Sequence, residues 1–199
     1  MNFTGPKVKK SRALGVALTP KAQKYLRNRP YAPGQHGQNR RRRRSEYGTQ
    51  LMEKQRLRFQ YNISEKYLQS AYAKVVKRKG PTGDLLLQFL EGRLDALVLR
   101  AGLAPSIFAA RQFVTHGHFR VNGRKASIPS MQLKPGDVIT IREKSKQLAM
   151  FNDLRQEVQP APYITLEDNG MAARFAYIPP REEIPVVCDE QLIVEYYNR

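Results

Sequence analysis

The first 45 residues contain thirteen Lys or Arg side chains and no Asp or Glu. Such a segment cannot neutralise itself through internal ion pairs, so it needs external anions to become ordered, and phosphates can supply them. Residues 46–150 carry a formal charge of +10 and residues 151–199 carry −5, which gives +18 for the chain. The alternative is a solvated, solubilising tail. A charge this large and this polarised predicts a polyanionic partner, and nucleic acid is the default.

Composition excludes several other classes of protein. No run of about 18 apolar residues is present, which excludes a membrane protein, and long apolar-periodic stretches exclude full disorder. Cys188 is the only cysteine in the sequence, which excludes a disulfide framework and a multi-thiolate zinc site. No signal peptide is visible. We therefore expect a soluble, intracellular protein without a cofactor or metal.

Residues 1–45 are rich in Gly and Pro, which predicts an extended, turn-rich basic arm. Near its end, Arg40, Arg41, Arg42, Arg43 and Arg44 form an unbroken run of like charges. Side chains that repel one another in this way are either disordered or bound to phosphates.

Helical periodicity begins after this arm and continues to residue 91. Few helix breakers occur over 46–61, and Ser64 is a suitable N-cap for an amphipathic helix with Leu68, Tyr72 and Val75 on its apolar face. A third helix, over 82–91, is apolar on nearly all sides, which favours burial.

Residues 92–145 predict a compact α-α-β-β-β module. One short helix runs from residue 93 to Gly102, and a second begins at Ser106 and ends near residue 116. The period then becomes strand-like, with a hairpin at Asn122-Gly123 and a third strand over 138–142.

The rest of the chain is less distinct. A short helix is expected within 146–160, short strands and loops over 161–199, and either a strand or a short helix over 191–197. We expect an α+β fold with three parts: a basic arm (1–45), a helical domain (46–91, completed by 146–199) and an inserted module (92–145).

Motifs throughout the chain resemble those of one family. In the module they are Gly92-Arg93-Leu94-Asp95, Arg100-Ala101-Gly102, Ala110-Arg111-Gln112, His116-Gly117-His118 and Pro135-Gly136-Asp137. In the flanks they are Gly5-Pro6-Lys7, Ala32 to Gly37, Leu51 to Arg56 and Leu192 to Glu195. Together they resemble the bacterial-type family of small-subunit ribosomal protein number four, in order and over nearly the whole chain.

This resemblance implies a non-enzymatic primary binder of 16S ribosomal RNA. It implies binding at a multi-helix junction of the 5′ domain, nucleation of the body of the small subunit, contact with small-subunit protein number five and other 30S proteins, and an influence on decoding accuracy in the cytoplasmic ribosome. The basic run from Arg40 to Arg44 would lie beside mRNA, where the messenger enters its channel. One branch of the family has an N-terminal four-cysteine zinc knuckle, which this chain lacks.

RNA in a folded junction is recognised by its shape and phosphate geometry, which requires donors held on rigid elements. We expect Arg93, Arg100, Arg111 and Gln112 to project from the module's helices, on the side opposite their packed faces. The N-terminus of the second helix, at Ser106, would offer backbone N–H groups. The full set of expected RNA-binding residues is Lys7, Lys9, Lys10, Arg12, Arg40, Arg41, Arg42, Arg43, Arg44, Arg93, Arg100, Ser106, Arg111, Gln112, His116, His118, Arg120, Arg124 and Lys125.

Two other functions fit part of the pattern. Gly-Arg-Leu-Asp also opens the catalytic motif of pseudouridine synthases, in which the aspartate is the nucleophile, but here it lies inside the module's own helix. Asp95 is better explained as a partner of Arg93, Arg100 or a neighbouring basic group. The second alternative is a ribosome-associated RNA-binding factor, which would need the module but not the matching N-terminal segment.

Overall fold

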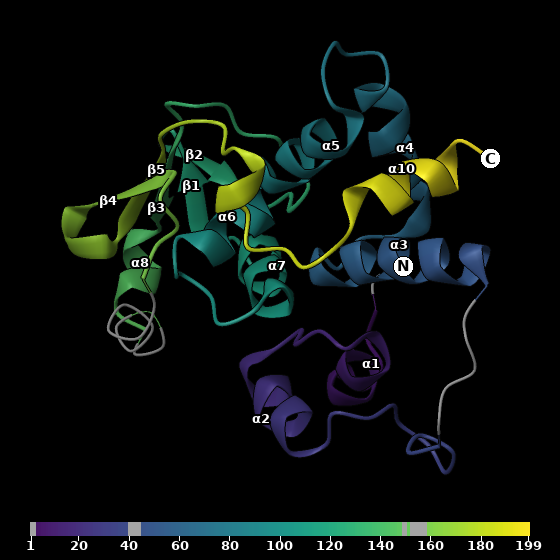
Figure 1. Cartoon of the computed structure of the whole chain (residues 1–199). Helices are drawn as coiled ribbons and strands as arrows, with labels where there is room; N and C mark the ends of the chain where they lie inside the picture. The colour runs from purple at the N-terminus through teal and green to yellow at the C-terminus, as the bar shows by residue number, and fades with distance from the viewer. Residues whose placement is uncertain (1–2, 40–44, 149–150, 152–158) are drawn as a thin grey trace. The chain divides into compact units, whose positions relative to one another are not determined.

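The computed structural model describes residues 3–39, 45–148, 151 and 159–199. Its chain divides into two compact units (Figure 1). The N-terminal unit comprises residues 1–86 and 185–199, and the module unit comprises residues 87–184. The expected run of five arginines, Arg40 to Arg44, lies outside the described residues.

The N-terminal unit is helical. Its helices are α1 (Lys7–Leu14), α2 (Pro20–Asn28), α3 (Glu46–Gln60), α4 (Glu65–Val75) and α10 (Glu190–Tyr197). A further helix, α5 (Thr82–Glu91), contains the division between the two units. The expected helices over 46–61 and 82–91 are thereby confirmed, and the helix expected after Ser64 is present and ends at Val75. The N-cap at Ser64 is confirmed, because its Oγ accepts the Tyr67 N–H at 3.2 Å. The segment 191–197, which the sequence left open between strand and helix, is helical.

The expectation of an extended arm over residues 1–45 is wrong for its first part. Thr19 caps α2 by accepting the Ala22 N–H at 3.3 Å, and Pro20 at the first helical position favours the same start. Leu14 of α1, Leu18 between the two helices and Ala22 of α2 are buried, so the segment is packed rather than extended. Arg56 of α3 donates from Nε to the Leu14 carbonyl at 2.9 Å. The α1–α2 segment is therefore part of the N-terminal unit.

The turn between α3 and α4 is fixed by the backbone. Asn62 adopts φ 47°, a left-handed conformation that Asn tolerates better than most residues. The Ile63 N–H donates to the Arg58 carbonyl at 3.1 Å, and the Asn62 N–H donates to the Phe59 carbonyl at 3.2 Å. This pair of bonds is a Schellman motif. It holds the end of α3 and the start of α4 in one defined geometry.

The module unit contains the expected α-α-β-β-β order. Helices α6 (Leu94–Arg100) and α7 (Ile107–Thr115) precede strands β1 (Phe119–Val121), β2 (Arg124–Ala126) and β3 (Val138–Ile141). The hairpin at Asn122-Gly123 is confirmed, with Val121 paired to Arg124. Both helices end at glycines with positive φ, Gly102 at 73° and Gly117 at 74°. The helices bury Leu97, Val98, Ala110 and Val114 in one core with Phe119.

The sheet is larger than the sequence predicted. Strands β4 (Ile164–Glu167) and β5 (Ala172–Phe175) extend it to the order β2-β1-β3-β5-β4, all antiparallel. These strands belong to the module unit, whereas the expected division assigned 146–199 to the helical domain. The difference arises because β5 pairs with β3 and buries Ala173 and Phe175 in the module's core. A short helix α8 (Glu143–Lys146) follows β3, and most of the expected helix over 146–160 lies outside the described residues.

Candidate nucleic-acid interface

Exposed cations and hydrogen-bond donors gather where α7 meets the β1–β2 hairpin. The exposed residues there are Gln112, His116, Arg120, Arg124 and Lys125, all of which the sequence predicted as RNA-binding. The Lys125 stem passes close to the turn after α7, because a Cβ built on Gly117 would lie 3.1 Å from Lys125 Cε. The hairpin thus brings strand cations to the end of a helix.

Two of these cations are direct neighbours on adjacent strands. Arg120 of β1 is paired directly with Lys125 of β2. Cross-strand neighbours of like charge destabilise a sheet, and a bound anion relieves that repulsion. The pair thus places two cationic donors side by side on the exposed face of the hairpin.

Arg93 does not project from the helix pair, so the expectation that it faces RNA is wrong. Its side chain is only 1% exposed, and it donates to both Asp95 oxygens, from Nε at 2.9 Å and from Nη2 at 2.6 Å. Arg111 adds a contact of 3.3 Å from Nη1 to Asp95 Oδ2. This confirms Asp95 as an ion-pair partner of Arg93. The burial of Asp95 also argues against the pseudouridine synthase alternative, because a catalytic nucleophile must reach its substrate and Asp95 is fully buried.

Arg100 is held in a second buried network rather than by Asp95. It pairs with Glu91, a fully buried carboxylate, which also accepts the Tyr163 hydroxyl at 2.5 Å. Burial, and then the negative charge of Glu91, raise the pKa of Tyr163. Arg100 and Arg111 are part-buried, so each presents only part of its guanidinium to a ligand. Their first role is to neutralise a buried acid.

Ser106 and His118 are also engaged within the protein. Ser106 caps α7 by accepting the Ala109 N–H at 3.3 Å. His118 Nδ1 lies 2.9 Å from the Ser145 hydroxyl, and its ring is part-buried. Burial, then the charges of His116 and Arg142, lower the pKa of His118 below its ordinary value. The ring is therefore mostly neutral at pH 7, when it hydrogen-bonds to α8.

The N-terminal cations have different surroundings. Arg12 donates from Nε to the Tyr31 carbonyl at 3.2 Å and lies over the Tyr31 ring at 4.9 Å. Lys7 donates to the Thr4 carbonyl at 3.0 Å, and Lys9 is exposed. Lys10 Nζ lies 4.2 Å from the centre of the Phe59 ring. Arg12 and Lys10 thus lie against a backbone carbonyl and aromatic rings.

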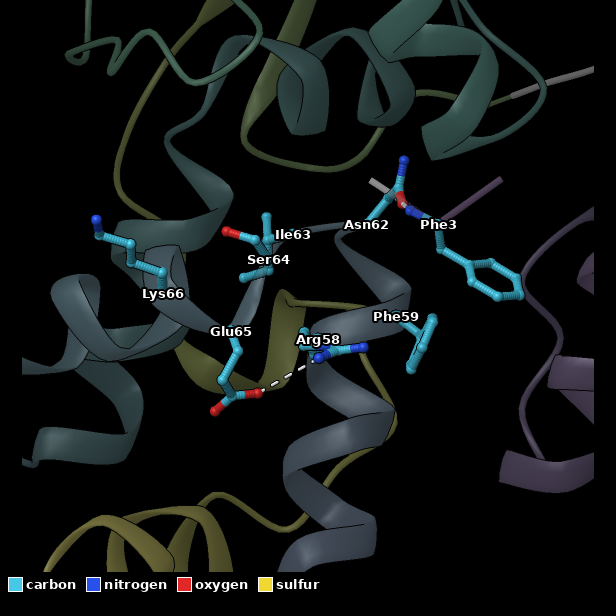
Figure 2. A pocket seen from close by; sticks show the side chains of 8 residues that line it. All are labelled: Phe3, Arg58, Phe59, Asn62, Ile63, Ser64, Glu65 and Lys66. Atoms are coloured by element: carbon cyan, nitrogen blue, oxygen red, sulfur yellow. Dashed lines mark hydrogen bonds and ion pairs between the residues drawn. The ribbon is translucent and has the colours of Figure 1, made fainter. Parts of the chain in front are cut away.

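A cavity of about 440 Å³ adjoins this segment at the α3–α4 turn. Figure 2 shows Arg58 between Glu65 and Phe59, with Phe3 beyond the Phe59 ring and Asn62 above it in this view. Arg58 and Lys66 were not predicted as functional residues, although both follow the basic pattern of the chain. Only the fold reveals that they share a cavity.

Within the described residues, no three His, Cys, Asp or Glu side chains are arranged to hold a metal ion. Nor does any described helix have the length and apolar character needed to cross a bilayer.

The fold and its cationic surfaces define a class of protein, one built around a compact RNA-binding module. Residues 92–139 match the S4 domain, and residues 2–91 match the ribosomal protein S4/S9 N-terminal domain. The chain is also 51% identical to a protein of Streptomyces avermitilis over 203 residues, covering 100% of this chain and 99% of that one. It is 47% identical to a protein of Thermobifida fusca, covering 100% of both chains, and 48% identical to one of Chlorobaculum tepidum, covering 99% and 98%.

All three relatives are named small ribosomal subunit protein uS4. The chain belongs to this family, which consists of ribosomal proteins and not of enzymes. The family resemblance drawn from the sequence motifs is thereby confirmed.

Proposed function

We propose that this chain is a structural protein of the small ribosomal subunit and that it binds 16S ribosomal RNA in the cytoplasm. The full-length similarity to small-subunit proteins is the observation that carries this proposal. The exposed cations of the α7–hairpin surface, and the acid-free N-terminal segment, supply the chemistry for binding phosphates.

The finer roles are part of the same proposal. The chain would bind a multi-helix junction of the 16S 5′ domain and nucleate assembly of the subunit body. Together with small-subunit protein number five, it would influence decoding accuracy. Residues Arg40 to Arg44 would lie beside mRNA at the mouth of its channel. What supports these roles is the match of the motifs in both the module and its flanks.

Filter binding to 16S 5′-domain RNA at several salt concentrations tests the RNA-binding role. Each neutralised phosphate contributes about −0.7 to −0.9 to the slope of log affinity against log salt. We expect a steep slope from several such contacts, and tighter binding than to a scrambled RNA of equal length. A flat slope, or equal affinity for both RNAs, would contradict the proposal.

Sedimentation separates a subunit component from a ribosome-associated factor. A structural protein remains with small subunits at one copy per particle after a high-salt wash, because it is built into the folded RNA. A factor that binds only through the module would be released or present in less than one copy.

A further inference from the structure

The sequence contains two Asn-Gly pairs, Asn122-Gly123 and Asn169-Gly170. Such a pair is open to a reaction between side chain and backbone, because glycine has no Cβ to hinder the approach of its own nitrogen to the preceding amide. Both pairs lie in turns of the module unit's sheet, one between β1 and β2 and the other between β4 and β5 (Figure 1). Asn122 and Asn169 are both exposed, so water reaches both side chains.

The side chain of Asn122 is held at both of its polar atoms. Its Nδ2 donates to Asp137 Oδ1 at 2.8 Å, and its Oδ1 accepts the Val138 N–H at 2.9 Å. Asp137 is itself fixed, because its other carboxylate oxygen accepts the Lys134 N–H at 2.7 Å. The Asn122 amide can therefore turn towards the Gly123 nitrogen only after two hydrogen bonds have broken.

The side chain of Asn169 has no such restraint. Among the described residues, none makes a hydrogen bond with it. The backbone around it is left-handed at three successive positions, with φ 49° at Asp168, 51° at Asn169 and 79° at Gly170. Non-glycine residues are strained in this conformation, because Cβ comes too close to the following carbonyl oxygen. The turn therefore combines a free amide with a backbone that gains by rearranging.

The reaction that these two features favour is deamidation through a cyclic imide. The Gly170 nitrogen loses its proton and attacks Asn169 Cγ, a C–N bond forms, and the side-chain nitrogen leaves as ammonia. One water then opens the imide at either of its carbonyls, which gives aspartate or isoaspartate. The overall change consumes one water and releases one ammonia, so it needs no oxidant, reductant or cofactor.

We propose that Asn169 is a site of spontaneous deamidation to aspartate and isoaspartate, and that Asn122 is protected from the same reaction by its hydrogen bonds to Asp137 and Val138. The proposal concerns the chemistry of the free chain and goes beyond the RNA-binding function, whose success or failure leaves it unaffected.

The modification would change the outer hairpin of the sheet. Isoaspartate adds one carbon to the backbone of the turn, and either product places a second negative charge beside Asp168, whose carboxylate already lies 3.0 Å from the Lys146 ammonium. Strand β4 is at the edge of the sheet, and its pairing with β5 begins next to the turn, where Glu167 lies opposite Ala172. We therefore expect weaker pairing of β4 and a lower thermal midpoint after the reaction.

The direct test incubates the full-length protein at mildly alkaline pH, which promotes loss of the glycine N–H proton. Peptide mapping by mass spectrometry measures the conversion of amide to acid at both positions in one sample, and an isoaspartate-specific carboxyl methyltransferase with a labelled methyl donor identifies the isoaspartate. Asn169 should react about tenfold or more faster than Asn122, because two hydrogen bonds must break at Asn122.

Two outcomes would overturn the proposal. The first is a rate at Asn122 equal to or above that at Asn169. The second is conversion at Asn169 no faster than at Asn198, which is followed by Arg rather than Gly.

The same incubation in concentrated urea separates the fold from the local sequence. Glycine follows both asparagines, so the two rates should become similar once the hydrogen bonds of Asn122 are lost. If the difference seen in the folded protein persists in urea, the flanking residues cause it, and protection by the fold is wrong.

Asp137→Ala tests the protection directly. It removes the acceptor of Asn122 Nδ2 and should raise the rate at Asn122 by about threefold or more, while the rate at Asn169 in the same sample stays unchanged. An unchanged rate at Asn122 would contradict protection by this bond.

Asn169→Gln is the matched control for the consequence of the reaction. Its longer side chain would have to close a larger ring, so conversion at position 169 should cease. The thermal midpoint of the parent should fall during incubation, and that of Asn169→Gln should not. An equal fall in both would show that the loss of stability arises elsewhere.

Discussion

The arginines of the α6–α7 helix pair and the lysines of α1 and α2 have opposite electrostatic surroundings. In the module unit, Arg93, Arg100 and Arg111 are each paired with a fully buried acid, Asp95 or Glu91. In the N-terminal unit, α1 and α2 belong to a segment without any acidic residue. Cationic residues therefore neutralise buried acids in one region, whereas in the other they belong to a segment whose own sequence contains no acid.

This difference explains which positive charges are available to RNA. A buried charge must be paired, since an isolated ion in the protein interior is very costly. The arginines of the module's helices accordingly pair with acids first, whereas the cations of the β1–β2 hairpin are exposed. The helices α1 and α2 contain no acidic residues. Arg12 donates a hydrogen bond to a backbone carbonyl, and the Lys10 ammonium lies over the Phe59 ring.

The largest expected effect follows from breaking the buried pair of the module unit. Asp95→Asn removes the carboxylate that Arg93 and Arg111 share and leaves the Arg93 charge buried, which should lower the free energy of unfolding by about 3 to 5 kcal/mol. Urea denaturation measures the change. Glu143→Gln is the control, because Glu143 is 83% exposed in its pair with Lys146 and should cost less than about 1 kcal/mol. Similar losses for both would mean that burial does not distinguish the pairs.

A smaller loss is expected at the second buried network. Tyr163→Phe removes the hydroxyl that donates to Glu91 and should cost about 1.5 to 3 kcal/mol, the range for hydrogen bonds to charged groups. Tyr177→Phe removes a similar bond of 2.8 Å to Glu183 at the surface and should cost well under 1 kcal/mol. The measurement is the thermal midpoint of each variant relative to that of the parent. An equal decrease for both variants would contradict the prediction.

The N-terminal cations should show the converse behaviour, with a loss of RNA binding and no loss of stability. Lys21→Gln combined with Lys24→Gln on α2 should reduce the salt slope by about 1.4 to 1.8, as expected for two phosphate contacts, and change stability by less than about 0.5 kcal/mol. Lys146→Gln is the matched control, because its ammonium already lies 3.0 Å from both Glu143 and Asp168. A lower melting temperature for the double variant would place these lysines among the structural cations.

Arg120 on the hairpin should show opposite signs in the two assays. Arg120→Thr removes the like-charge pair with Lys125 and should stabilise the free protein by about 0.2 to 1 kcal/mol, while it weakens RNA binding. Arg174→Gln breaks the 2.6 Å ion pair between β5 and Glu167 of β4, so it should lower the stability of the free protein. If Arg120→Thr is less stable than the parent, the repulsion is not significant.

The smallest effect is expected from pH. Because the pKa of His118 is lower in the folded state, the unfolded state binds more protons near pH 6, and stability falls as the pH drops through the ordinary pKa of histidine, about 6.5. Thermal midpoints between pH 7.5 and 5.5 should therefore decrease, and His118→Gln should flatten this decrease. His36→Gln, at an exposed position in the N-terminal unit, is the control. An unchanged profile in His118→Gln would show that another group titrates.

The local features of the fold could be predicted because their partners lie a few residues apart. Ser64 and Ser106 cap helices through N–H groups three residues on, and Asn122-Gly123 closes a two-residue hairpin. The start of α2 has the same kind of local signal in Thr19-Pro20, although the Gly and Pro content of the whole segment favours an extended chain. Of the candidate interface, the sequence correctly predicted exposure for the hairpin cations: Arg120 lies at the outward position of the alternating strand β1, and Arg124 and Lys125 lie beside the turn on β2.

By itself, then, the sequence determined the separation of charge along the chain, the helices between residues 46 and 115 and the hairpin, because composition, caps and turns are properties of neighbouring residues. Only the tertiary structure decided that Arg93 is buried, that Tyr163 reaches Glu91 across 72 positions, that β5 joins β3, and that Arg58 shares a cavity with Lys66 and lies on the same ring as Lys10. These outcomes depend on which surfaces pack together. Packing brings distant residues into contact and determines whether a charge needs a partner within the protein or remains free to bind an anion.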